Sequence, residues 1–463
     1  MQRASNQPAE RVTDSGVSSG IATAKRSETG PLRVVICGGG SGGLVLATAL
    51  ADKNGRNPNY AVTLVDPTAT HVWKPLLHEF ASGSADASFH EVAFIALARW
   101  HGFHFAQGPL EAIDREKREV LIGAAHDETG AELAPPRRLP YDVLVIAVGG
   151  VTNDFNIPGV RENAYFLDGA VDAERLHRRI VQACMRANHG LDAGVQHLDI
   201  AIVGGGATGV ELAAELRATT RELLAYGLDN LDPEKFIRLK VINADPRLLL
   251  QLPERIASSV EEILHKLNVD VLNGQMVTEV TPGRIMTKSG ESIASDITIW
   301  AAGVKAPGFL ANIGGLETNR ANQIVVTPTL QTTRDPNIFA IGDCAAAPWL
   351  GTDKLVPPRA QAAYQQARYL LKAIPRSAAG ELLKPFSYND LGSLVSLGGQ
   401  SAVGTLMGLA RGAGIRIEGF LAQMIYRWLY KRHQAALYGW WAVSLDSIGG
   451  WMRRVTRPQV KVH

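Results

Sequence analysis

The fold is decided by the stretch Arg33-Val-Val-Ile-Cys-Gly-Gly-Gly-Ser-Gly-Gly43, in which a β-branched run enters a glycine-rich turn. A helical run follows at 44–50, and a second strand-like run at 60–66 ends in Asp66. A strand, a glycine turn, a helix and a strand in this order form a βαβ unit.

A turn of this kind suits a nucleotide pyrophosphate, which must approach the main chain closely. One glycine permits the tight bend, a second leaves room for the phosphates, and a third lets the helix pack on the strand. Gly38, Gly40 and Gly43 have this spacing, and Ser41 lies in the same turn. We therefore expect this turn to bind a dinucleotide, with Asp66 bonded to its ribose.

The same pattern returns in the middle of the chain. A strand is expected at 198–203, a glycine turn at 204–209, a helix from residue 210 and a returning strand at 239–243. The three spaced glycines are Gly204, Gly206 and Gly209. One such turn is weak evidence, but two turns, each between a strand and a helix, predict two dinucleotide-binding folds.

The returning strand of the second fold ends in Asn243, where an acid is usual for NAD. Asparagine can still bond a ribose 2′-hydroxyl, but it does not repel a 2′-phosphate, and Arg247 lies four residues further on. We expect NADH as the substrate, with partial tolerance of NADPH as the alternative.

Three more buried strands are expected to run into glycine turns. They lead into Gly149, into Gly303 and into the pair Gly342-Asp343. Gly149 and Gly303 are predicted to contact the bound cofactors.

Composition narrows the class of protein. The chain has 463 residues, enough for two or three domains, and its 46% apolar and 20% charged residues are typical of a folded protein. A net charge of +2 gives no reason to expect a nucleic-acid partner. Three cysteines without a CxxC pair exclude a disulfide framework, suit a reducing compartment and point to no metal site.

Two dinucleotide folds followed by a Gly-Asp turn resemble the two-dinucleotide-binding-domain flavoproteins. Three further segments are similar to the type II NADH dehydrogenases (NADH:quinone oxidoreductases) of the proteobacterial type. They are the WKPLLHE stretch at 73–79, the AQxAxQ motif at 360–365 and the tail from 390 to 458. The resemblance covers residues 31–463. Disulfide reductases are less well supported, because the redox CxxxxC after the first turn is absent.

The resemblance implies FAD on the first fold, NADH on the second and a membrane quinone as electron acceptor. It places Asp343 at the ribityl-phosphate region of FAD, and it brings Lys74 and Ala360 to the cofactor.

The resemblance also implies three catalytic residues. Glu211 would lie near the nicotinamide and the flavin, where it either orients the carboxamide or joins proton delivery to the quinone. Gln361 and Gln365 are one helical turn apart, and they would line the quinone site with amides that bond carbonyl groups without adding charge.

Near the C-terminus, apolar residues recur at helical spacing. They are Phe420, Leu421, Met424, Ile425, Trp428 and Leu429, and a polar stripe of Gln423, Arg427, Lys431 and Gln434 accompanies them. Aromatic residues beside Lys and Arg suit the headgroup boundary of a bilayer, and no segment has the roughly 20 apolar residues of a spanning helix. We expect this module to lie on the lipid surface; the alternative is a helical hairpin packed on the body or at a dimer interface.

We therefore expect an α/β protein with two Rossmann-like dinucleotide-binding domains and a C-terminal membrane-associating module. The expected parts are a disordered extension (1–30), an FAD-binding domain (31–160 and 305–385), an NADH-binding domain (161–304) and the C-terminal module (386–463).

The expected activity is non-proton-pumping respiratory NADH:quinone oxidoreduction. We expect a peripheral protein at the cytoplasmic face of the inner (cell) membrane, with a homodimer as a possible assembly. Two alternatives stay open: a soluble NAD(P)H-dependent flavoprotein reductase with a protein acceptor, and a redox sensor that holds FAD and NADH.

Overall fold

The computed structural model describes most of the chain between Gly30 and Gly449. The described residues are 30–51, 59–127, 129–191, 196–225, 233–398, 402–406, 415–439, 441, 443–445, 447 and 449. Residues 1–29 of the expected N-terminal extension, and the basic tail after residue 450, lie outside them.

The first large sheet has five parallel strands in the order β23-β11-β1-β2-β5. They are β1 (Leu32–Cys37), β2 (Tyr60–Asp66), β5 (His104–Gln107), β11 (Val143–Ile146) and β23 (Ile338–Ala340). Strand β11 is buried throughout, as expected of a parallel strand covered on both faces. Helix α1 (Gly43–Ala51) follows the first glycine turn and packs against α9 (Ala360–Ala378).

The second large sheet repeats this arrangement in the order β13-β20-β14-β15-β16. Its strands are β13 (Ala164–Tyr165), β14 (Leu198–Val203), β15 (Ile237–Asn243), β16 (Val269–Asn273) and β20 (Ile297–Trp300). Its helices are α5 (Ala170–Asn188), α6 (Ala207–Ala225) and α8 (Glu254–Lys266). The prediction of two Rossmann-like folds is confirmed, and the second-fold helix begins at Ala207, before the predicted residue 210.

A small antiparallel sheet accompanies each fold. The first orders its strands β10-β7-β6 and the second β17-β18-β19. Their bounds are β6 Leu110–Asp114, β7 Glu119–Ile122, β10 Arg137–Pro140, β17 Val277–Thr281, β18 Gly283–Thr287 and β19 Ser292–Ser295. The remaining short elements are β3 Thr70–His71, η1 Lys74–Leu76, α2 Leu77–Ser82, η2 Ala87–Phe89, β4 Val92–Ala93, α3 Phe94–His101, β8 Ala125–His126, β9 Glu132–Ala134, α4 Val160–Asn163, α7 Pro233–Phe236, η3 Gly308–Leu310, η4 Ile313–Gly315, β22 Ile324–Val325, η5 Gly342–Cys344 and β24 Ala345–Ala346.

The chain passes between the two folds through a pair of antiparallel strands, β12 (Val151–Thr152) and β21 (Val304–Lys305). The buried carboxylate of Asp154 holds this crossing together. It accepts a hydrogen bond from the Lys305 ammonium at 2.6 Å and another from the Arg161 guanidinium. These two cations hold the pKa of Asp154 far below its usual range.

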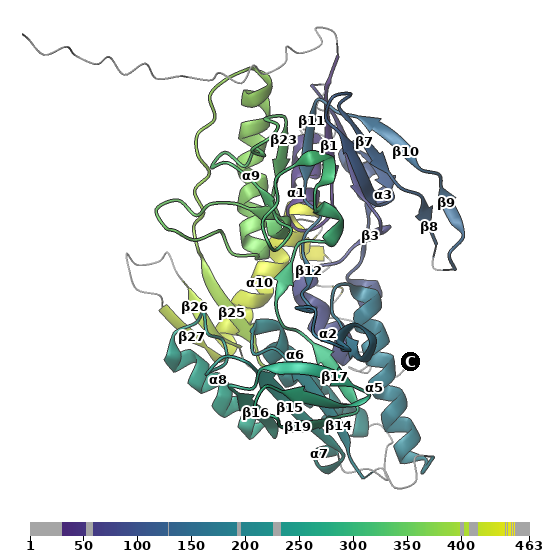
Figure 1. The fold of residues 1–463 in the computed structure, drawn as a ribbon, viewed down its shortest axis with the longest axis vertical. Coiled ribbons are helices and arrows are strands. Elements are labelled where there is room, and N and C mark those ends of the chain that lie inside the picture. The colour runs from purple at the N-terminus through teal and green to yellow at the C-terminus, as the bar shows by residue number, and fades with distance from the viewer. Residues whose placement is uncertain are drawn as a thin grey trace, which may run out of the picture.

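The C-terminal part joins both folds. Strands β25 (Gly392–Ser396), β26 (Ala402–Leu406) and β27 (Ile415–Glu418) form an antiparallel sheet, and α10 (Gly419–Tyr438) follows them. Figure 1 shows α10 running through the middle of the molecule, between the two nucleotide folds. Val395 of β25 belongs to the hydrophobic core of the second fold, whereas Leu437 of α10 belongs to that of the first.

Replacing Asp154 by Asn should loosen the crossing. The change removes the charge that pairs with Lys305 and Arg161, and we expect a loss of about 2 kcal/mol of unfolding free energy at pH 7. Because the folded-state pKa of Asp154 is depressed, the wild-type advantage is present above about pH 4 and is lost as the pH falls below it. Thermal unfolding midpoints measured from pH 7 down to pH 3 check this.

The matched control is Asp114→Asn, which removes an exposed pair with Lys117 and should change stability by less than about 0.5 kcal/mol. If the Asp154 variant unfolds with the wild-type midpoint at pH 7, the ion pairs do not stabilise the crossing.

Candidate functional site

The first glycine turn has the shape that a pyrophosphate needs. A Cβ placed on Gly38 would stand 2.2 Å from the Ala147 carbonyl oxygen, and one on Gly43 would stand 1.9 Å from the Gly38 carbonyl oxygen. A Cβ on Gly40, by contrast, would meet no heavy atom of the described chain within 4 Å. The outer glycines are therefore required by the protein itself, and the middle one faces open space.

The second turn repeats this division. A Cβ on Gly204 would come within 2.8 Å of the Ala301 main chain, and one on Gly209 within 2.0 Å of the Gly204 carbonyl oxygen. Around Gly206 no described atom lies within 4 Å of the same position. Both turns thus fit a dinucleotide that passes over the middle glycine at the start of a helix. Ser41 lies half-buried in the first turn.

Two half-buried carboxylates and one lysine surround the first turn. Asp66 accepts a hydrogen bond from the Gly39 main-chain N–H at 2.7 Å and another from the Thr68 hydroxyl at 2.6 Å. Burial raises the pKa of Asp66 and of Asp343, and the positive charge of Lys74 opposes the rise at both residues. The Lys74 ammonium donates to the Gly150 carbonyl at 3.0 Å, which holds it over the turn after β11. The structure therefore brings these three predicted residues into one electrostatic group.

The remaining residues predicted on the first fold lie near the same edge of the sheet. Gly149 follows β11 with a φ of +73°, a conformation that favours glycine. The turn at Gly342 is held by Gln366, whose side-chain oxygen accepts from the Gly342 N–H at 2.7 Å. Ala360 is the first residue of α9, the helix that carries Gln366 and packs against this turn. Gln366 is buried and was not predicted.

On the second fold, Gly303 corresponds to Gly149 and has a φ of +71°. A Cβ there would meet the Phe155 ring at 2.5 Å. Asn243 ends β15, as predicted, but its amide is engaged within the protein. The amide nitrogen donates to the main-chain carbonyls of Asp245 and Arg247 and to the Asn273 side-chain oxygen, at 2.9–3.1 Å.

Arg247 is also engaged. Its guanidinium donates to the main-chain carbonyls of four residues, Leu248, Leu249, Leu250 and Leu252, at 2.9–3.3 Å. The idea that it attracts a 2′-phosphate is therefore not supported, because its donors hold the loop. Asn243 and Arg247 together hold the loop that lies beside the second turn.

Glu211 lies on α6, one turn after the first helical residue Ala207, and is 8% exposed. One carboxylate oxygen accepts from the Ser396 N–H at 3.0 Å, and the other lies 3.7 Å from the Nδ1 atom of His78. Burial raises the pKa of Glu211 to about 8, and the nearby Glu79 and Glu215 add to the rise. These surroundings favour the protonated form of Glu211 at neutral pH. A surface acid stabilised only by the helix dipole would not have these properties.

Gln361 and Gln365 share one face of α9, as predicted, and both hold the segment before β25. Gln361 accepts from the Leu391 N–H at 3.1 Å and donates to the Gly392 carbonyl at 3.0 Å. Gln365 exchanges two hydrogen bonds with the main chain of Asn389, at 2.8 and 3.0 Å. The sequence predicts that these amides line the quinone site; in the structure they hold residues 389–392, which form a wall beside the start of α9.

An ion pair anchors the same wall. The guanidinium of Arg359, which precedes α9, lies 3.3 Å from the Asp390 carboxylate and also donates to the Gln251 side chain at 3.0 Å. Asp390 and Arg359 were not predicted as site residues, because their pairing joins segments that lie 31 residues apart.

Two buried histidines connect the first glycine turn to α10. The Nδ1 atom of His71 donates to the Gly39 carbonyl at 2.8 Å, and its Nε2 atom lies 3.1 Å from Nε2 of His433. The His433 ring packs on Trp73 with a centroid separation of 4.0 Å. Burial lowers the pKa of His71 to about 4, so this chain of hydrogen bonds is uncharged at neutral pH.

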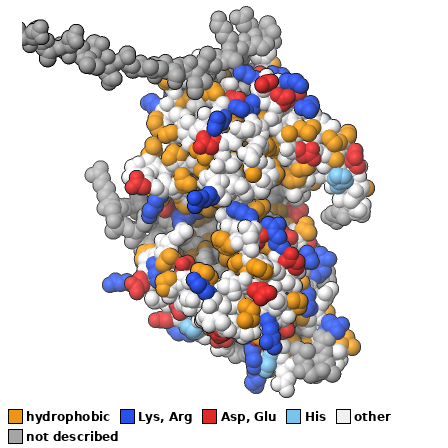
Figure 2. All heavy atoms as spheres, in the orientation of Figure 1, with side chains coloured by type: hydrophobic (Ala, Val, Ile, Leu, Met, Phe, Trp, Pro, Cys, Tyr) orange, Lys and Arg blue, Asp and Glu red, His pale blue; other side chains and the backbone are white. Residues whose placement is uncertain are grey.

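The outer face of α10 is apolar. Leu421, Met424 and Trp428 are each about half exposed or more, and their exposed fractions are 58%, 53% and 49%. Gln423, which the sequence pattern placed on a polar stripe, is buried. No helix among the described residues is long and apolar enough to span a membrane. On the face shown in Figure 2, Lys and Arg side chains are intermixed with Asp and Glu over the described part.

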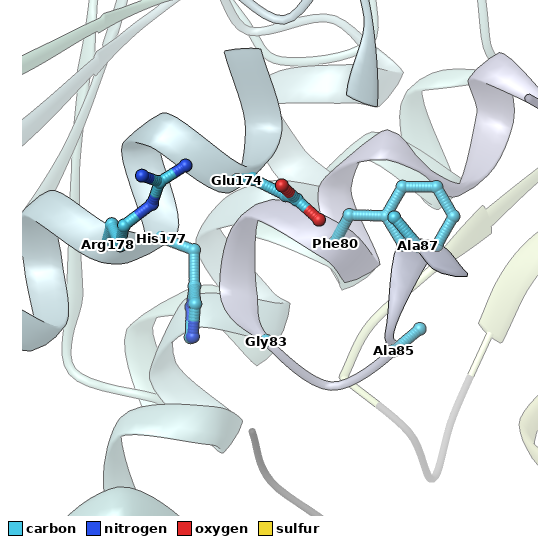
Figure 3. Close-up of a pocket in the computed structure, with 7 residues that line it drawn as sticks. All are labelled: Phe80, Gly83, Ala85, Ala87, Glu174, His177 and Arg178. Atoms are coloured by element: carbon cyan, nitrogen blue, oxygen red, sulfur yellow. The ribbon is translucent and has the colours of Figure 1, made fainter. Parts of the chain in front are cut away.

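A small hollow lies between α2 and α5, apart from the two turns. Its volume is about 50 Å³, and Phe80, Gly83 and His177 are among the residues that line it (Figure 3). This volume holds one or two water molecules and no cofactor. The three cysteines are buried and free, and burial raises the pKa of Cys184 to about 11 and that of Cys344 to about 12.

Comparison with known proteins agrees with this geometry. Residues 32–367 match the pyridine nucleotide-disulphide oxidoreductase family. A type II NADH:quinone oxidoreductase from Haemophilus influenzae is 41% identical over 443 residues, which are 93% of this chain and 99% of that relative. The type II NADH:quinone oxidoreductase NdhA from Mycobacterium tuberculosis is 30% identical over 433 residues, which are 88% and 86% of the two chains.

Solved structures share the fold. NDH2 from Plasmodium falciparum, in complex with NADH, superposes with a TM-score of 0.73 at 21% identity and covers 93% of this chain and 100% of its own. The sulfide:quinone oxidoreductase of Aquifex aeolicus superposes with a TM-score of 0.68 at 20% identity and covers 88% of this chain and 92% of its own.

Replacing Asn243 by Asp should destabilise the second turn. A carboxylate cannot donate, and it would face two main-chain carbonyls and the Asn273 oxygen. We expect a loss of about 2–3 kcal/mol in unfolding free energy and a higher KM for NADH. Thermal unfolding and steady-state kinetics check this.

The control is Asn319→Asp, because the side-chain oxygen of Asn319 accepts hydrogen bonds from the N–H groups of Ala321 and Gln323, and a carboxylate can accept them too. Equal stability of the two variants would contradict the role given to the Asn243 amide.

Arg247→Ala should likewise lower stability while leaving the ratio of kcat/KM for NADH over NADPH within about twofold of wild type, because its donors are held by carbonyls. A large rise in that ratio would mean that the guanidinium reaches the 2′-phosphate after all.

Proposed function

This chain belongs to the pyridine nucleotide-disulphide oxidoreductase family and, within it, to the type II NADH:quinone oxidoreductases, and we propose how its residues divide that reaction. The reaction is the oxidation of NADH with a quinone as electron acceptor, without proton pumping. FAD, when bound, takes a hydride from NADH and passes two electrons on. The observation that carries the assignment is the pair of turns whose outer glycines touch protein and whose middle glycine faces open space.

The first turn holds FAD. Gly40 leaves room for its pyrophosphate, and the start of α1 directs main-chain N–H groups at the phosphates. Asp66 holds the Gly39 main chain with one oxygen, which keeps its carboxylate beside the turn for the ribose. Asp343 and Lys74 are assigned to the ribityl-phosphate region, where the positive charge of the lysine opposes the rise in the pKa of the half-buried aspartate.

The second turn holds NADH. Gly206 leaves room for the pyrophosphate. Asn243 holds the loop beside the ribose through its amide, and it has no negative charge with which to select between a 2′-hydroxyl and a 2′-phosphate. Gly303 follows β20 next to the turn, at the place that Gly149 has after β11 in the first fold. The two sites thus use the same strand ends for different nucleotides.

Glu211 gives a proton to the quinone. Its burial and the neighbouring carboxylates keep it protonated at neutral pH, and Ser396 of β25 holds one of its oxygens. A neutral acid in a dry site is a proton donor matched to this pH. Glu211 also lies where α6 contacts β25, the strand that follows the wall assigned to the quinone.

Gln361 and Gln365 are positioning residues for the quinone. Through four hydrogen bonds they hold residues 389–392 against the start of α9, close to the Gly342 turn. The quinone headgroup approaches along this wall, and the amide of Gln361, once released from Gly392, supplies an uncharged donor for its carbonyl.

The quinone is taken from a lipid bilayer that contacts α10. Its inner face is fixed to the first fold through His433 and Leu437, so the apolar side chains of its outer face stay exposed. Exposed Leu, Met and Trp beside basic residues suit the boundary between headgroups and acyl chains. We place the protein on the cytoplasmic side, which the three reduced, buried cysteines favour.

Anaerobic stopped-flow spectroscopy tests the reaction and the wall together. NADH should bleach the flavin absorbance of the purified enzyme, and a quinone should restore it. In Gln361→Ala the bleaching should stay within about twofold of wild type, whereas recovery should slow by about tenfold or more, because residues 391 and 392 lose their anchor.

The matched control is Gln331→Ala, a glutamine that also holds a main-chain carbonyl, that of Pro336, on the loop before β23. It should leave both half-reactions unchanged. Equal slowing of bleaching and recovery in Gln361→Ala contradicts the quinone-site role, and bleaching without recovery in wild type leaves a reductase with a protein acceptor.

Acidic residues on the outer face of α10 should release the protein from lipid. In Leu421→Glu/Met424→Glu, co-sedimentation with phospholipid vesicles should weaken by about tenfold or more, because burial of each apolar side chain is worth roughly 1.5–3 kcal/mol. Turnover with a short-chain, water-soluble quinone should be retained.

Leu382→Glu is the control, because Leu382 is 96% exposed after α9 and lies outside the α10 face. Unchanged sedimentation of the double variant would overturn the lipid proposal. If the variant converts a dimer into a monomer without changing vesicle binding, the face is an interface between two copies.

A further inference from the structure

Gly39, the residue before the open middle glycine of the first turn, is held by side chains on three sides. Its N–H donates to the Asp66 carboxylate at 2.7 Å, and its carbonyl accepts from the Nδ1–H of His71 at 2.8 Å. A Cβ on Gly39 would stand 2.2 Å from the Phe94 ring, so the ring closes the third side. Gly39 is buried, whereas Gly40 is exposed. The main chain is therefore fixed one residue before the place assigned to the pyrophosphate.

The hydrogen bond from His71 sets the direction of the Gly40 N–H. The carbonyl of Gly39 and the N–H of Gly40 belong to one planar trans peptide unit, so they point in opposite directions. The N–H turns away from the His71 ring, and a Cβ on Gly40 would meet no described heavy atom within 4 Å. This N–H also has no acceptor among the described residues, which leaves it available to a phosphate oxygen.

The His71 ring can donate to Gly39 only in one tautomer. A carbonyl only accepts, so the ring proton must be on Nδ1, and burial lowers the pKa of His71 to about 4, which leaves the ring with one proton at neutral pH. Its Nε2 atom therefore accepts, and the atom 3.1 Å away, Nε2 of His433, must be the donor. Without that donor the buried Nε2 atom of His71 has no partner, and the tautomer that donates to Gly39 loses its advantage.

His433 is itself held in place for this bond. It lies on α10, 362 residues after His71 in the chain, and it is buried. The Trp73 ring packs on it with a centroid separation of 4.0 Å, which limits rotation of the ring that donates. A hydrogen-bonded chain thus runs from α10 through two histidines to the peptide beside Gly40.

We propose that His433 is a positioning residue for FAD, which by donating to His71 holds the Gly39–Gly40 peptide with its N–H toward the cofactor pyrophosphate. The inference rests on the proposed binding of FAD at the first turn. It gives α10 a part in cofactor binding, separate from the contact with lipid proposed for its outer face.

The rate at which the holoenzyme releases FAD after dilution tests this role. His433→Leu removes the ring donor, and release should become about fivefold faster or more, because the N–H at the phosphate loses its fixed direction. His433→Gln should return the rate to within about twofold of wild type, since its amide can donate from the position of Nε2. The fluorescence of freed FAD follows the rate. If His433→Leu does not fold, His433→Asn replaces it, because asparagine is too short to donate from that position.

A change at His71 separates the tautomer from the packing. In His71→Asn the amide nitrogen takes the place of Nδ1 and donates to Gly39 without a partner at His433. Adding His433→Leu to His71→Asn should therefore cause no further increase in the release rate, although the same substitution accelerates release in the wild-type background. A full additional increase would mean that His433 does not act through His71.

His101→Leu is the matched control. The Nε2 atom of His101 bonds the Leu437 carbonyl at 2.8 Å, so it also ties α10 to the first fold, but through α3 and not through His71. Its replacement should leave the rate of FAD release within about twofold of wild type. Equal acceleration in His101→Leu and His433→Leu, or wild-type release in His433→Leu, overturns the proposal.

Gly40→Val tests the underlying assignment by itself. Its side chain fills the space left for the pyrophosphate, and the purified variant should contain no FAD. If this variant holds FAD as wild type does, the first turn is not the FAD site and the proposed function fails. If it lacks FAD while His433→Leu releases FAD at the wild-type rate, only the role of His433 fails.

Discussion

Main-chain atoms at the two strand-to-helix turns come so close together that a Cβ cannot stand at Gly38, Gly43, Gly204 or Gly209. This close packing fixes where each helix begins, and so it fixes the direction of the main-chain N–H groups at Gly40 and Gly206. In each sheet the parallel strands bring their carboxyl ends to one edge. The turn at Gly149 lies at this edge of the first sheet, and the turn at Gly303 lies at this edge of the second. Every group assigned to cofactor or substrate is placed by reference to these two turns.

The turns and their sheets were predictable because their causes are local. A strand, a glycine spacing and a helix follow one another within a few dozen residues, and β2 and β14 have the predicted bounds. The engagement of Asn243 was not predictable, since its amide is held by a loop conformation and by Asn273 on the neighbouring strand. Sequence spacing likewise placed Gln361 and Gln365 on one face of α9, but the segment that they bind arrives from beyond the helix. His78 lies in a recognised motif, yet its contact with Glu211 joins α2 to α6, and only the folded chain reveals it.

The C-terminal part is joined to the redox site at two points. Ser396 of β25 bonds Glu211, and His433 of α10 bonds His71, which in turn bonds the Gly39 carbonyl of the first glycine turn. The helix that we propose to meet the lipid is therefore joined by one chain of hydrogen bonds to the turn that we assign to the FAD phosphates. Because its buried face uses uncharged histidines, α10 keeps its exposed apolar face without placing charge next to the cofactor.

The second nucleotide fold enters and leaves the first through strands that pair with each other, Val151 with Lys305 and Thr152 with Val304. Its two ends therefore lie side by side, as do the ends of a domain inserted into a surface loop of a host. An exchange of this insert would need a compatible pair of strands, an aspartate at position 154 to meet Lys305 and Arg161, and a surface that packs against α2 and β25. The electron donor could then change during evolution while the first nucleotide fold, the wall proposed for the acceptor and the helix proposed to face the membrane stayed as they are.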